Sequence, residues 1–387
     1  MSTARYSVGI DLGTTNSVVS YAELSFCEGE QAPVSVLPIP QLTAPGTVGE
    51  RKQLPSFVYQ AHESELAPGD VVLPWNEHPE AIVGDLARQL GSKTPIRLVA
   101  SAKSWLSHSG VDRRSALLPV QSPQDVPHIS PVQAQRYYLQ HLSDAWDARF
   151  PDAPLAEQDL VITVPASFDP AARELTVEAA HTVGLRQAIL LEEPQSALYS
   201  WIQTSQGQWR EQVKPGDIIL VVDVGGGTTD LSLIAVTEED GNLVLNRVAI
   251  GDHILLGGDN MDLALAYVLK AKLEAEGKRL EGWQIQALTH GCRDAKESLL
   301  AEGGESEVVV VVPSRGSSLI SGTLRTTLTR DEVNRTLVEG FFPKVSISDR
   351  PLVQARTGLT TLGLPYAKDA RITCHLAAFL SRQRGAT

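Results

Sequence analysis

Two copies of one short pattern, far apart in the chain, constrain what this 387-residue sequence can fold into. The first is YSVGIDLGTTNSVVSY at residues 6–21, and the second is IILVVDVGGGTTDLSLIAV at residues 218–236. Each has an apolar β-branched run, an aspartate, a turn of glycine and threonine, and a second β-rich run, which is typical of two strands joined by a turn. A repeat at this long spacing indicates two related lobes rather than a solenoid of short units.

The segments between and after these hairpins predict a mixed α/β architecture. A buried strand at 160–164 precedes a helix that Asp169 and Pro170 begin and Gly184 ends, and residues 188–201 give a second strand followed by a second helix. Strands alternating with helices beside hairpins are typical of an α/β lobe. In the second half we expect helices at 261–276 and 282–301, strands at 307–313 and 318–328, a capping box from Thr329 to Glu332, and a final helix in the last residues.

Two proline-rich regions, about 31–79 and 117–131, interrupt the first half. A short strand is predicted at 54–60 and helices at 80–89 and 97–107. An amphipathic helix is predicted at 131–150, with Tyr138, Leu142 and Trp146 at four-residue spacing. Loops of this length are unusual, and they are either docking surfaces or simply long connections.

Composition excludes several classes of protein. The formal net charge of −13 and the pI of about 5.2 argue against binding to nucleic acid or to an anionic membrane, because both need a basic surface. Cys27, Cys292 and Cys374 form no C-x-x-C pair, so they predict buried or incidental thiols rather than a zinc site or a disulfide framework. The sequence shows no signal peptide and no stretch long enough to span a bilayer, so the expected location is the cytoplasm.

The two turns carry groups that suit phosphate and a divalent cation. In DLGTTN, Asp11 ends a strand, Gly13 lets backbone amides approach phosphate oxygens, and Thr14 and Thr15 add hydroxyl donors. This turn alone could be an ordinary hairpin. In DVGGGTTD, residues 223–230, three consecutive glycines are costly in a hairpin unless a phosphate lies against the bare backbone. Together the loops predict a clamp around a phosphate group, with Asp223 and Asp230 able to flank Mg²⁺.

The motifs GIDLGTTNSVV, VITVPASFD, EEPQSAL and DVGGGTTDLSL resemble those of the actin, sugar kinase and heat-shock chaperone superfamily, and are most similar to its seventy-kilodalton heat-shock chaperone branch. The resemblance covers residues 6–20 and 159–300 well, 54–107 loosely and the C-terminal part poorly. It implies the nucleotide-binding domain of a divergent family member, with a two-lobed, actin-like ATPase fold built on ribonuclease H-like repeats. Lobe I would be 1–214, with an insertion at about 45–125, and lobe II would be 215–387 and incomplete.

The resemblance implies roles for matching residues. Asp11 and Asp223 would hold Mg²⁺ through water, Glu193 would orient the attacking water, and Lys103 would contact the γ-phosphate, although a solvated turn and a surface lysine are the alternatives. Pro165 and Arg173 resemble a switch that transmits nucleotide state. The implied catalytic residues are Glu193, Lys103, Thr228 and Asp223, and the implied ATP- or ADP-binding residues are Gly13, Thr14, Thr15, Asn16, Gly225, Gly226, Gly227, Thr228, Gly257, Gly258, Asp259 and Lys296, with Cys292 and Ala295 on the same adenine-side helix.

The chain departs from the family pattern in two places. Glu297 and Leu300 stand where the family has an adenine-stacking arginine and a serine, and an acidic side chain cannot make the cation–π contact, so base selectivity should be altered. No adjacent glycine pair occurs after residue 313, so residues 357–380 suggest a helical insertion before a missing adenosine segment. We therefore expect a chain truncated at its C-terminus and without a peptide-binding domain.

Three functions are compatible with these features. The first is an ATP-hydrolysing domain of a heat-shock-type chaperone, with co-chaperones and unfolded proteins as partners of the full-length protein. The second is a small-molecule kinase of the same superfamily, which the EEP turn and the VPA strand make less favoured. The third is a non-catalytic nucleotide-binding or interaction protein, which Glu297 and the missing segment favour.

Overall fold

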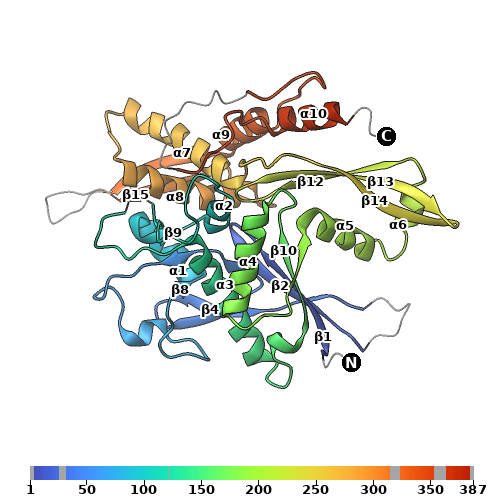
Figure 1. The fold of residues 1–387 in the computed structure, drawn as a ribbon. Coiled ribbons are helices and arrows are strands. Elements are labelled where there is room, and N and C mark those ends of the chain that lie inside the picture. Colours follow the sequence, from blue (N-terminus) through green and yellow to red (C-terminus); the bar gives the residue numbers. More distant parts are fainter. Residues whose placement is uncertain (1–3, 26–31, 121, 314–322, 353–362, 384–387) are drawn as a thin grey trace.

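The computed structural model describes residues 4–25, 32–120, 122–313, 323–352 and 363–383. Its first half is built on a six-stranded sheet in the order β11-β10-β1-β2-β3, with β6 also paired to β2 (Figure 1). Strand β1 pairs in parallel with β10 and antiparallel with β2, so the predicted hairpin lies in the middle of the sheet. The strands are β1 (Tyr6–Leu12), β2 (Asn16–Glu23), β3 (Ser35–Val36), β6 (Leu54–Pro55), β10 (Asp159–Val164) and β11 (Ile189–Glu192).

Helices α3 (Pro131–Arg149) and α4 (Pro170–Thr182) pack against this sheet and close the first hydrophobic core. Tyr138 and Trp146 of α3 are fully buried there beside Ile10 and Ile162 of the sheet. Both helices begin as predicted, because Ser130 and Asp169 accept hydrogen bonds from the backbone amides of Gln133 and Ala172 and a proline follows each of them.

The insertion in the first half holds more strand than the sequence predicts. A hairpin of β4 (Ile39–Ala44) and β5 (Thr47–Arg51) lies inside the proline-rich region, and β7 (Val58–Tyr59) pairs with β8 (Ile82–Val83) and β9 (Leu98–Val99). The short helices here are η1 (Pro68–Val71), α1 (Asp85–Lys93), η2 (Pro95–Arg97) and α2 (Ala102–Leu106).

Two predicted helices of this region are wrong at their beginnings. The helix expected at 80–89 begins at Asp85, because Ile82 and Val83 pair with β7 and are buried, Ile82 in the same cluster as Leu86. The helix expected at 97–107 is reduced to α2, because Leu98 and Val99 form β9. Ser101 has a φ of 54°, which is not a right-handed helical conformation, so the helix begins only after it. In both places pairing with a distant strand overrides the local helical pattern.

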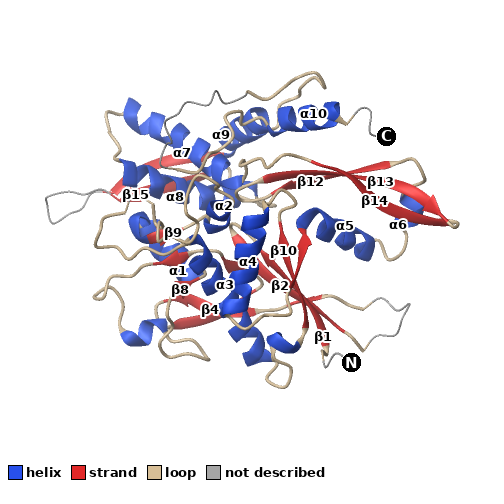
Figure 2. Ribbon diagram, in the orientation of Figure 1, coloured by secondary structure: helices blue, strands red, loops and turns tan. Residues whose placement is uncertain are grey.

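The second half is built around the sheet β12-β13-β14, whose strands are antiparallel (Figure 2). The predicted hairpin forms β12 (Ile218–Val224) and β13 (Thr229–Glu239), whereas β14 (Asn242–Ile250) was not predicted. Helices α7 (Gly258–Ala275), α8 (Gly282–Leu300) and α10 (Ile372–Arg382) supply residues to a second hydrophobic core with β13 and the hairpin of β15 (Glu307–Pro313) and β16 (Thr323–Thr329).

The remaining predictions are largely confirmed. The capping box of Thr329 and Glu332 begins α9 (Arg330–Asn334), which continues as the π-helical turn η4 (Arg335–Glu339). Helix α5 (Glu193–Thr204) lies beside β12, and η3 (Leu155–Glu157) and α6 (Trp209–Gln212) complete the described elements (Figure 1). Residues 318–322 of the last predicted strand, residues 357–362 of the predicted insertion, and Cys27 lie outside the described residues. The α/β class is confirmed, while the lobe boundary at 214/215 stays a prediction.

Candidate nucleotide site

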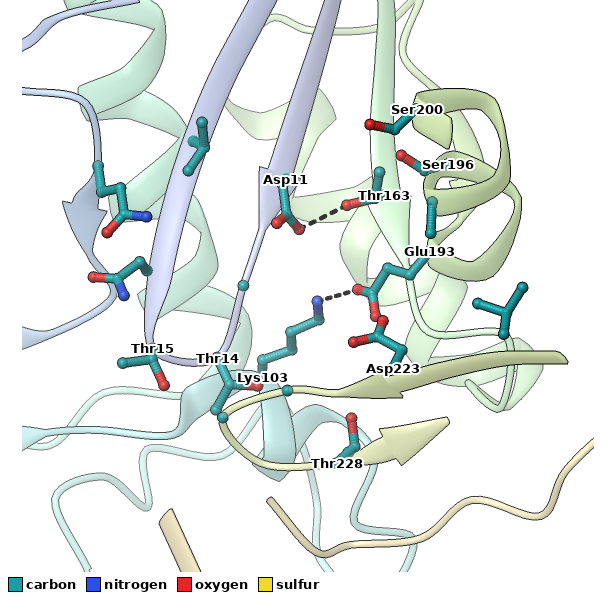
Figure 3. A pocket seen from close by; sticks show the side chains of 18 of the residues that line it. Asp11, Thr14, Thr15, Lys103, Thr163, Glu193, Ser196, Ser200, Asp223 and Thr228 are labelled. Atoms are coloured by element: carbon teal, nitrogen blue, oxygen red, sulfur yellow. Dashed lines mark hydrogen bonds and ion pairs between the residues drawn. The ribbon is translucent and has the colours of Figure 1, made fainter. Parts of the chain in front are cut away.

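A cavity of about 510 Å³ lies where the two glycine- and threonine-containing turns meet (Figure 3). It takes residues from β1, β2 and β10, from α2 and α5, and from β12. The lining includes most of the predicted site residues, namely Asp11, Gly13, Thr14, Thr15, Asn16, Lys103, Glu193, Asp223, Gly225, Gly226 and Thr228. The predicted catalytic set is therefore brought together from segments far apart in the sequence.

The first turn, residues 12–15, is held by a second segment of the chain. Asp11 lies opposite Thr163 in the parallel pairing of β1 and β10, and the Thr163 hydroxyl donates to the Asp11 carboxylate at 2.9 Å. Ser56 donates its hydroxyl to the Gly13 carbonyl at 2.8 Å and its backbone amide to the Thr15 carbonyl at 2.8 Å. These bonds hold the turn in place beside the cavity that Gly13, Thr14 and Thr15 line.

The glycines of the second turn, residues 225–228, are required by close approach of the first half of the chain. A Cβ added at Gly226 would lie 2.1 Å from the Thr15 hydroxyl, and one added at Gly227 would lie 2.1 Å from the hydroxyl of Ser104. The sequence predicted that phosphate would require these glycines. The structure gives a different reason for two of them, since protein atoms already occupy the space that a side chain would fill.

Gly257, Gly258 and Asp259 support this second turn from behind. The amide of Gly258 donates to the Gly225 carbonyl at 3.0 Å, and that of Asp259 donates to the Gly226 carbonyl at 2.7 Å. A Cβ at Gly257 would lie 2.5 Å from the Gly225 oxygen. None of the three lines the cavity, and neither does Gly227. Their predicted contact with nucleotide stays a prediction, and their observed contacts are with the turn.

Lys103 and Glu193 form the central ion pair of the cavity. The Lys103 ammonium lies 2.5 Å from a Glu193 carboxylate oxygen, and both side chains are largely buried. Burial raises the pKa of Glu193 to about 6, although Lys103 opposes this. Burial alone would lower the pKa of Lys103, but the carboxylates of Glu193 and Asp11 outweigh it and the pKa is raised. Lys103 therefore remains a cation at neutral pH.

Asp223 lies beside Glu193 in the cavity (Figure 3), whereas Asp230 is not among the residues that line it. Burial raises the pKa of Asp223, and the charge of Asp230, its partner across the β12–β13 hairpin, adds to this. Asp230 is buried and accepts a hydrogen bond from Ser167 at 2.5 Å. His253 lies within hydrogen-bonding distance of Ser167 (2.6 Å) and Ser107 (3.0 Å), so this group connects the two halves of the chain.

The residues predicted beside adenine are engaged with one another. Lys296 lies 2.6 Å from Asp262, and Arg293 contacts both Asp262 (2.7 Å) and Asp259 (2.6 Å) in a buried network. Burial acts against the charge on Asp259 and raises its pKa, while Arg293 opposes this. Lys296 does not line the cavity.

Glu297 and Leu300, which replace the family's arginine and serine, both lie on helix α8. Glu297 and Asp294 both contact Arg88 of α1, while Leu300 is exposed. Glu297 is thus used in a contact between the insertion and α8.

Of the predicted switch residues, Arg173 contacts the residue that precedes Glu193. Arg173 donates to the carbonyls of Ala166 and Phe168, in the turn that follows Pro165, and to the Glu192 carboxylate at 2.8 Å. Glu192 also contacts Arg247 of β14. Arg173 therefore reaches both the turn and the residue preceding Glu193, and its role as a switch stays a prediction.

Sequence reasoning missed several lining residues. Thr163 could have been found by aligning the two predicted strands in parallel, because it lies opposite Asp11. Gln53 and Ser200 lie outside the quoted motifs, and Ser196 lies within EEPQSAL but was not predicted to line the site. The buried Ser104 hydroxyl, which has no hydrogen-bond partner among the described residues, also lacked a signal.

The residues present fit a hydrated magnesium ion and a phosphate group. Among the described residues, no group of three or more His, Cys, Asp or Glu side chains could hold a metal ion directly. Magnesium keeps several waters and usually takes one or two carboxylates plus substrate phosphates, which suits Asp11 and Asp223 on one cavity. The described cysteines, Cys292 and Cys374, are free and buried. No helix in the described part of the chain is long and apolar enough to cross a membrane.

Comparison with known proteins gives one consistent result. The chain is 30% identical over 389 residues to "Chaperone protein HscA" of Yersinia pseudotuberculosis, with 92% of this chain and 56% of that protein aligned. It is 27% identical over 369 residues to "Chaperone protein HscA homolog" of Shewanella baltica, covering 89% and 53% of the two chains. A homolog of the same name from Pseudomonas aeruginosa is 30% identical over 315 residues, covering 77% and 42%.

The chain thus spans about half the length of the curated relatives it matches. The model of one protein family, described as "Hsp70 protein", matches residues 7–354. This match includes both glycine and threonine turns, the VPASFD and EEP segments and helix α8. It extends over most of the sequence, and the chain therefore belongs to the Hsp70 protein family.

Proposed function

We propose that this chain binds ATP and ADP with Mg²⁺ and hydrolyses ATP, as the nucleotide-binding domain of a heat-shock-type chaperone. The observation that carries the proposal is the convergence of Asp11, Lys103, Glu193 and Asp223 on one cavity between the two turns. Positioned charge of this kind stabilises phosphoryl transfer without a covalent intermediate. Family membership and the relatives' names, which include the word chaperone, support the same function.

Each residue would have a distinct task. Backbone amides of the two turns and the Thr14, Thr15 and Thr228 hydroxyls would bind phosphate oxygens. Lys103 would neutralise charge on the terminal phosphate, and Glu193 would accept a proton from, or orient, a water molecule. Asp11 and Asp223 would hold the waters of the Mg²⁺ ion, which supplies electrostatic stabilisation of the transferring phosphoryl group.

The cellular location and the partner proteins are also part of this proposal, and they rest on family membership. We expect the protein to act in the cytoplasm with co-chaperones and with unfolded proteins as clients. The relatives that support this expectation are about twice as long as the aligned part, so client binding is assigned to the whole protein and not to residues 1–387.

A second candidate is a nucleotide-binding protein without turnover. The observation that favours it is the network around α8, where Lys296 contacts Asp262 and Glu297 contacts Arg88. These contacts engage the side chains that would otherwise hold or select the base.

Calorimetric titration with Mg²⁺-ATP, followed by a steady-state phosphate-release assay, tests the proposal. Micromolar or tighter binding together with turnover that depends on Glu193 is the expected result. Binding without turnover would favour the second candidate. A folded protein that binds neither ATP nor ADP would contradict both functions for this chain.

A further inference from the structure

A second cavity, of about 480 Å³, lies between α3 and residues 73–83 of the insertion. It shares no lining residue with the nucleotide cavity. Residues 73–79 belong to the proline-rich region that the nucleotide function leaves unexplained. The side chains that define its chemistry are Trp75, Glu80, Tyr137, His141, Asp144 and Asp147.

One face of α3 supplies most of the polar wall. Tyr137, His141, Asp144 and Asp147 recur at spacings of three and four residues, which places them on one side of a helix. The amide of Gln140 donates to Asp144 at 2.8 Å, and Asp147 accepts the backbone amide of Leu155 at 2.7 Å. Both carboxylates therefore keep acceptor capacity toward the cavity, since an ionised carboxylate accepts about four hydrogen bonds.

His141 adds a neutral acceptor to the same wall. Its side chain is 5% exposed, and its Nε2 lies 2.9 Å from the Pro40 carbonyl oxygen. A carbonyl can only accept, so Nε2 carries the proton and Nδ1 has a free lone pair. Burial lowers the pKa of His141 to about 4, so the ring stays neutral at pH 7. The ring also meets Trp75 edge to face, with centroids 5.3 Å apart.

The charges around the cavity do not balance among the described residues. Arg136 is the one lining cation of this set, and it contacts Glu80 at 2.6 Å, where Tyr137 also donates at 3.1 Å. Asp144 and Asp147 have no described cationic partner within ion-pair distance. Burial raises the pKa of Asp144 and the like charge of Asp147 adds to this, so a cation between them would be favourable.

We propose that this cavity binds an organic cation, a primary ammonium or guanidinium group carried on an apolar stem. The two carboxylates and the His141 lone pair accept the N–H groups of such a cation. Trp75 supplies aromatic surface for the charge, and Leu73 and Val83 supply apolar surface for the stem, whereas the Tyr137 ring already has the Arg136 guanidinium 4.6 Å from its centroid. A small inorganic cation would leave the aromatic and apolar walls unused.

Cadaverine and N-acetyl-lysine amide are the two probes, and 1-pentanol is the neutral control. Calorimetry on the folded full chain should show saturable binding of at least one cation, at least about tenfold tighter than pentanol. Asp144→Asn keeps the shape and the Gln140 contact and should weaken that binding about tenfold. Asp152→Asn, at an exposed site outside the cavity, is the matched control and should change nothing.

The two probes separate the two sources of such a group. Tighter binding of cadaverine supports a free amine as the natural ligand, and tighter binding of the lysine amide supports a side chain of a partner protein. The proposal is overturned if no cation binds the folded protein up to about 10 mM, if pentanol binds equally well, or if Asp144→Asn binds as the wild type does. Circular dichroism of each variant establishes that it is folded.

Discussion

At the scale of single residues, the position of Glu193 makes the sharpest prediction. Glu193→Gln removes the carboxylate that would accept or orient a proton of the attacking water but keeps its size. We expect ATP turnover to fall about a hundredfold or more, with Mg²⁺-ATP affinity changed little. Single-turnover hydrolysis and calorimetry measure the two quantities separately.

Glu302→Gln, at an exposed position after α8, is the control for this experiment and should retain full turnover. Normal turnover in Glu193→Gln would remove Glu193 from the mechanism. Loss of binding together with turnover would instead assign the residue to holding Lys103 in place.

His141 predicts how stability depends on pH. Its pKa is about 4 in the folded protein because it is buried, against about 6.5 in an unfolded chain. Between these values the unfolded chain binds a proton that the folded chain does not, so stability should fall as pH decreases from 6.5 toward 4. The contribution of this one group is about 1.4 kcal/mol per pH unit.

Urea unfolding at several pH values, compared between wild type and His141→Gln, checks this contribution. Glutamine can still donate to the Pro40 carbonyl but cannot gain a proton, so the variant should lose less stability on acidification. Parallel curves for the two proteins would show that His141 does not carry the effect.

The contacts of individual residues were the part least accessible from sequence. Asp11, Glu193 and the glycines were found because they lie in short motifs. The pairing of Lys103 with Glu193 depends on two segments that meet only in the folded chain, and position in the sequence could only suggest it. The ion pairs of Arg293 have no local pattern at all, because their partners lie on another helix.

At the scale of structural elements, the close approach of the two turns allows us to predict the effect of adding a methyl group at Gly226. Gly226→Ala would place a Cβ 2.1 Å from the Thr15 hydroxyl, so the Thr15 side chain must rotate or the turns must separate. We expect a loss of stability of about 1–3 kcal/mol and weaker Mg²⁺-ATP binding. Removing the opposing hydroxyl with Thr15→Ala should restore part of the stability, which denaturant unfolding of the double variant measures.

Gly340→Ala is the control, because a Cβ there meets no atom within 4 Å. If Gly226→Ala were as stable as this control and bound nucleotide normally, the close contact between Gly226 and Thr15 would not limit either property.

Elements with strong local signals were predicted well, and elements defined by distant pairing were not. Strand β15 has the predicted bounds, and α3 and α8 differ from prediction by one residue at one end. The hairpin of β4 and β5 was missed because prolines obscure the alternation of buried and exposed side chains. Ile82 and Val83 looked helical in sequence but form a strand, since β7 offers them backbone partners.

At the scale of the whole molecule, Arg88 connects the insertion to α8 through Asp294 and Glu297. Since α8 is predicted to lie beside the base, breaking this contact should ease opening of the site. We expect Arg88→Gln to release a fluorescent ADP analogue roughly two to five times faster, because a partly exposed ion pair contributes up to about 1 kcal/mol. The difference should shrink as salt rises toward about 1 M. Stopped-flow displacement measures the rates.

Arg114→Gln is the matched control, because it breaks an exposed pair with Glu178 that lies within the first half of the chain. Equal acceleration in both variants would mean that the contact across the halves has no special effect on nucleotide release. An unchanged release rate in Arg88→Gln would contradict the prediction directly.

The division into two halves, each with its own core, could be predicted from the sequence because each half contains one copy of the repeated hairpin. The first copy lies in the middle of the six-stranded sheet, the second forms two of the three strands of the sheet β12-β13-β14, and each half has its own hydrophobic core. The contacts between the two halves could not be predicted from the sequence. His253, Ser107 and Ser167 make them, and no local sequence pattern marks these residues as partners.

The nucleotide cavity also has a consequence for the order in which its ligands arrive. Asp11, Asp223 and Glu193 oppose a single ammonium, that of Lys103, so the four groups together carry a formal charge of about −2 at neutral pH. A free polyphosphate approaching this surplus would be repelled more strongly than one already bound to a divalent cation, because the cation cancels part of its negative charge. Binding of the metal to the nucleotide should therefore raise the rate of association with the protein. The protein should distinguish the metal complex of its nucleotide from the bare anion before hydrolysis begins.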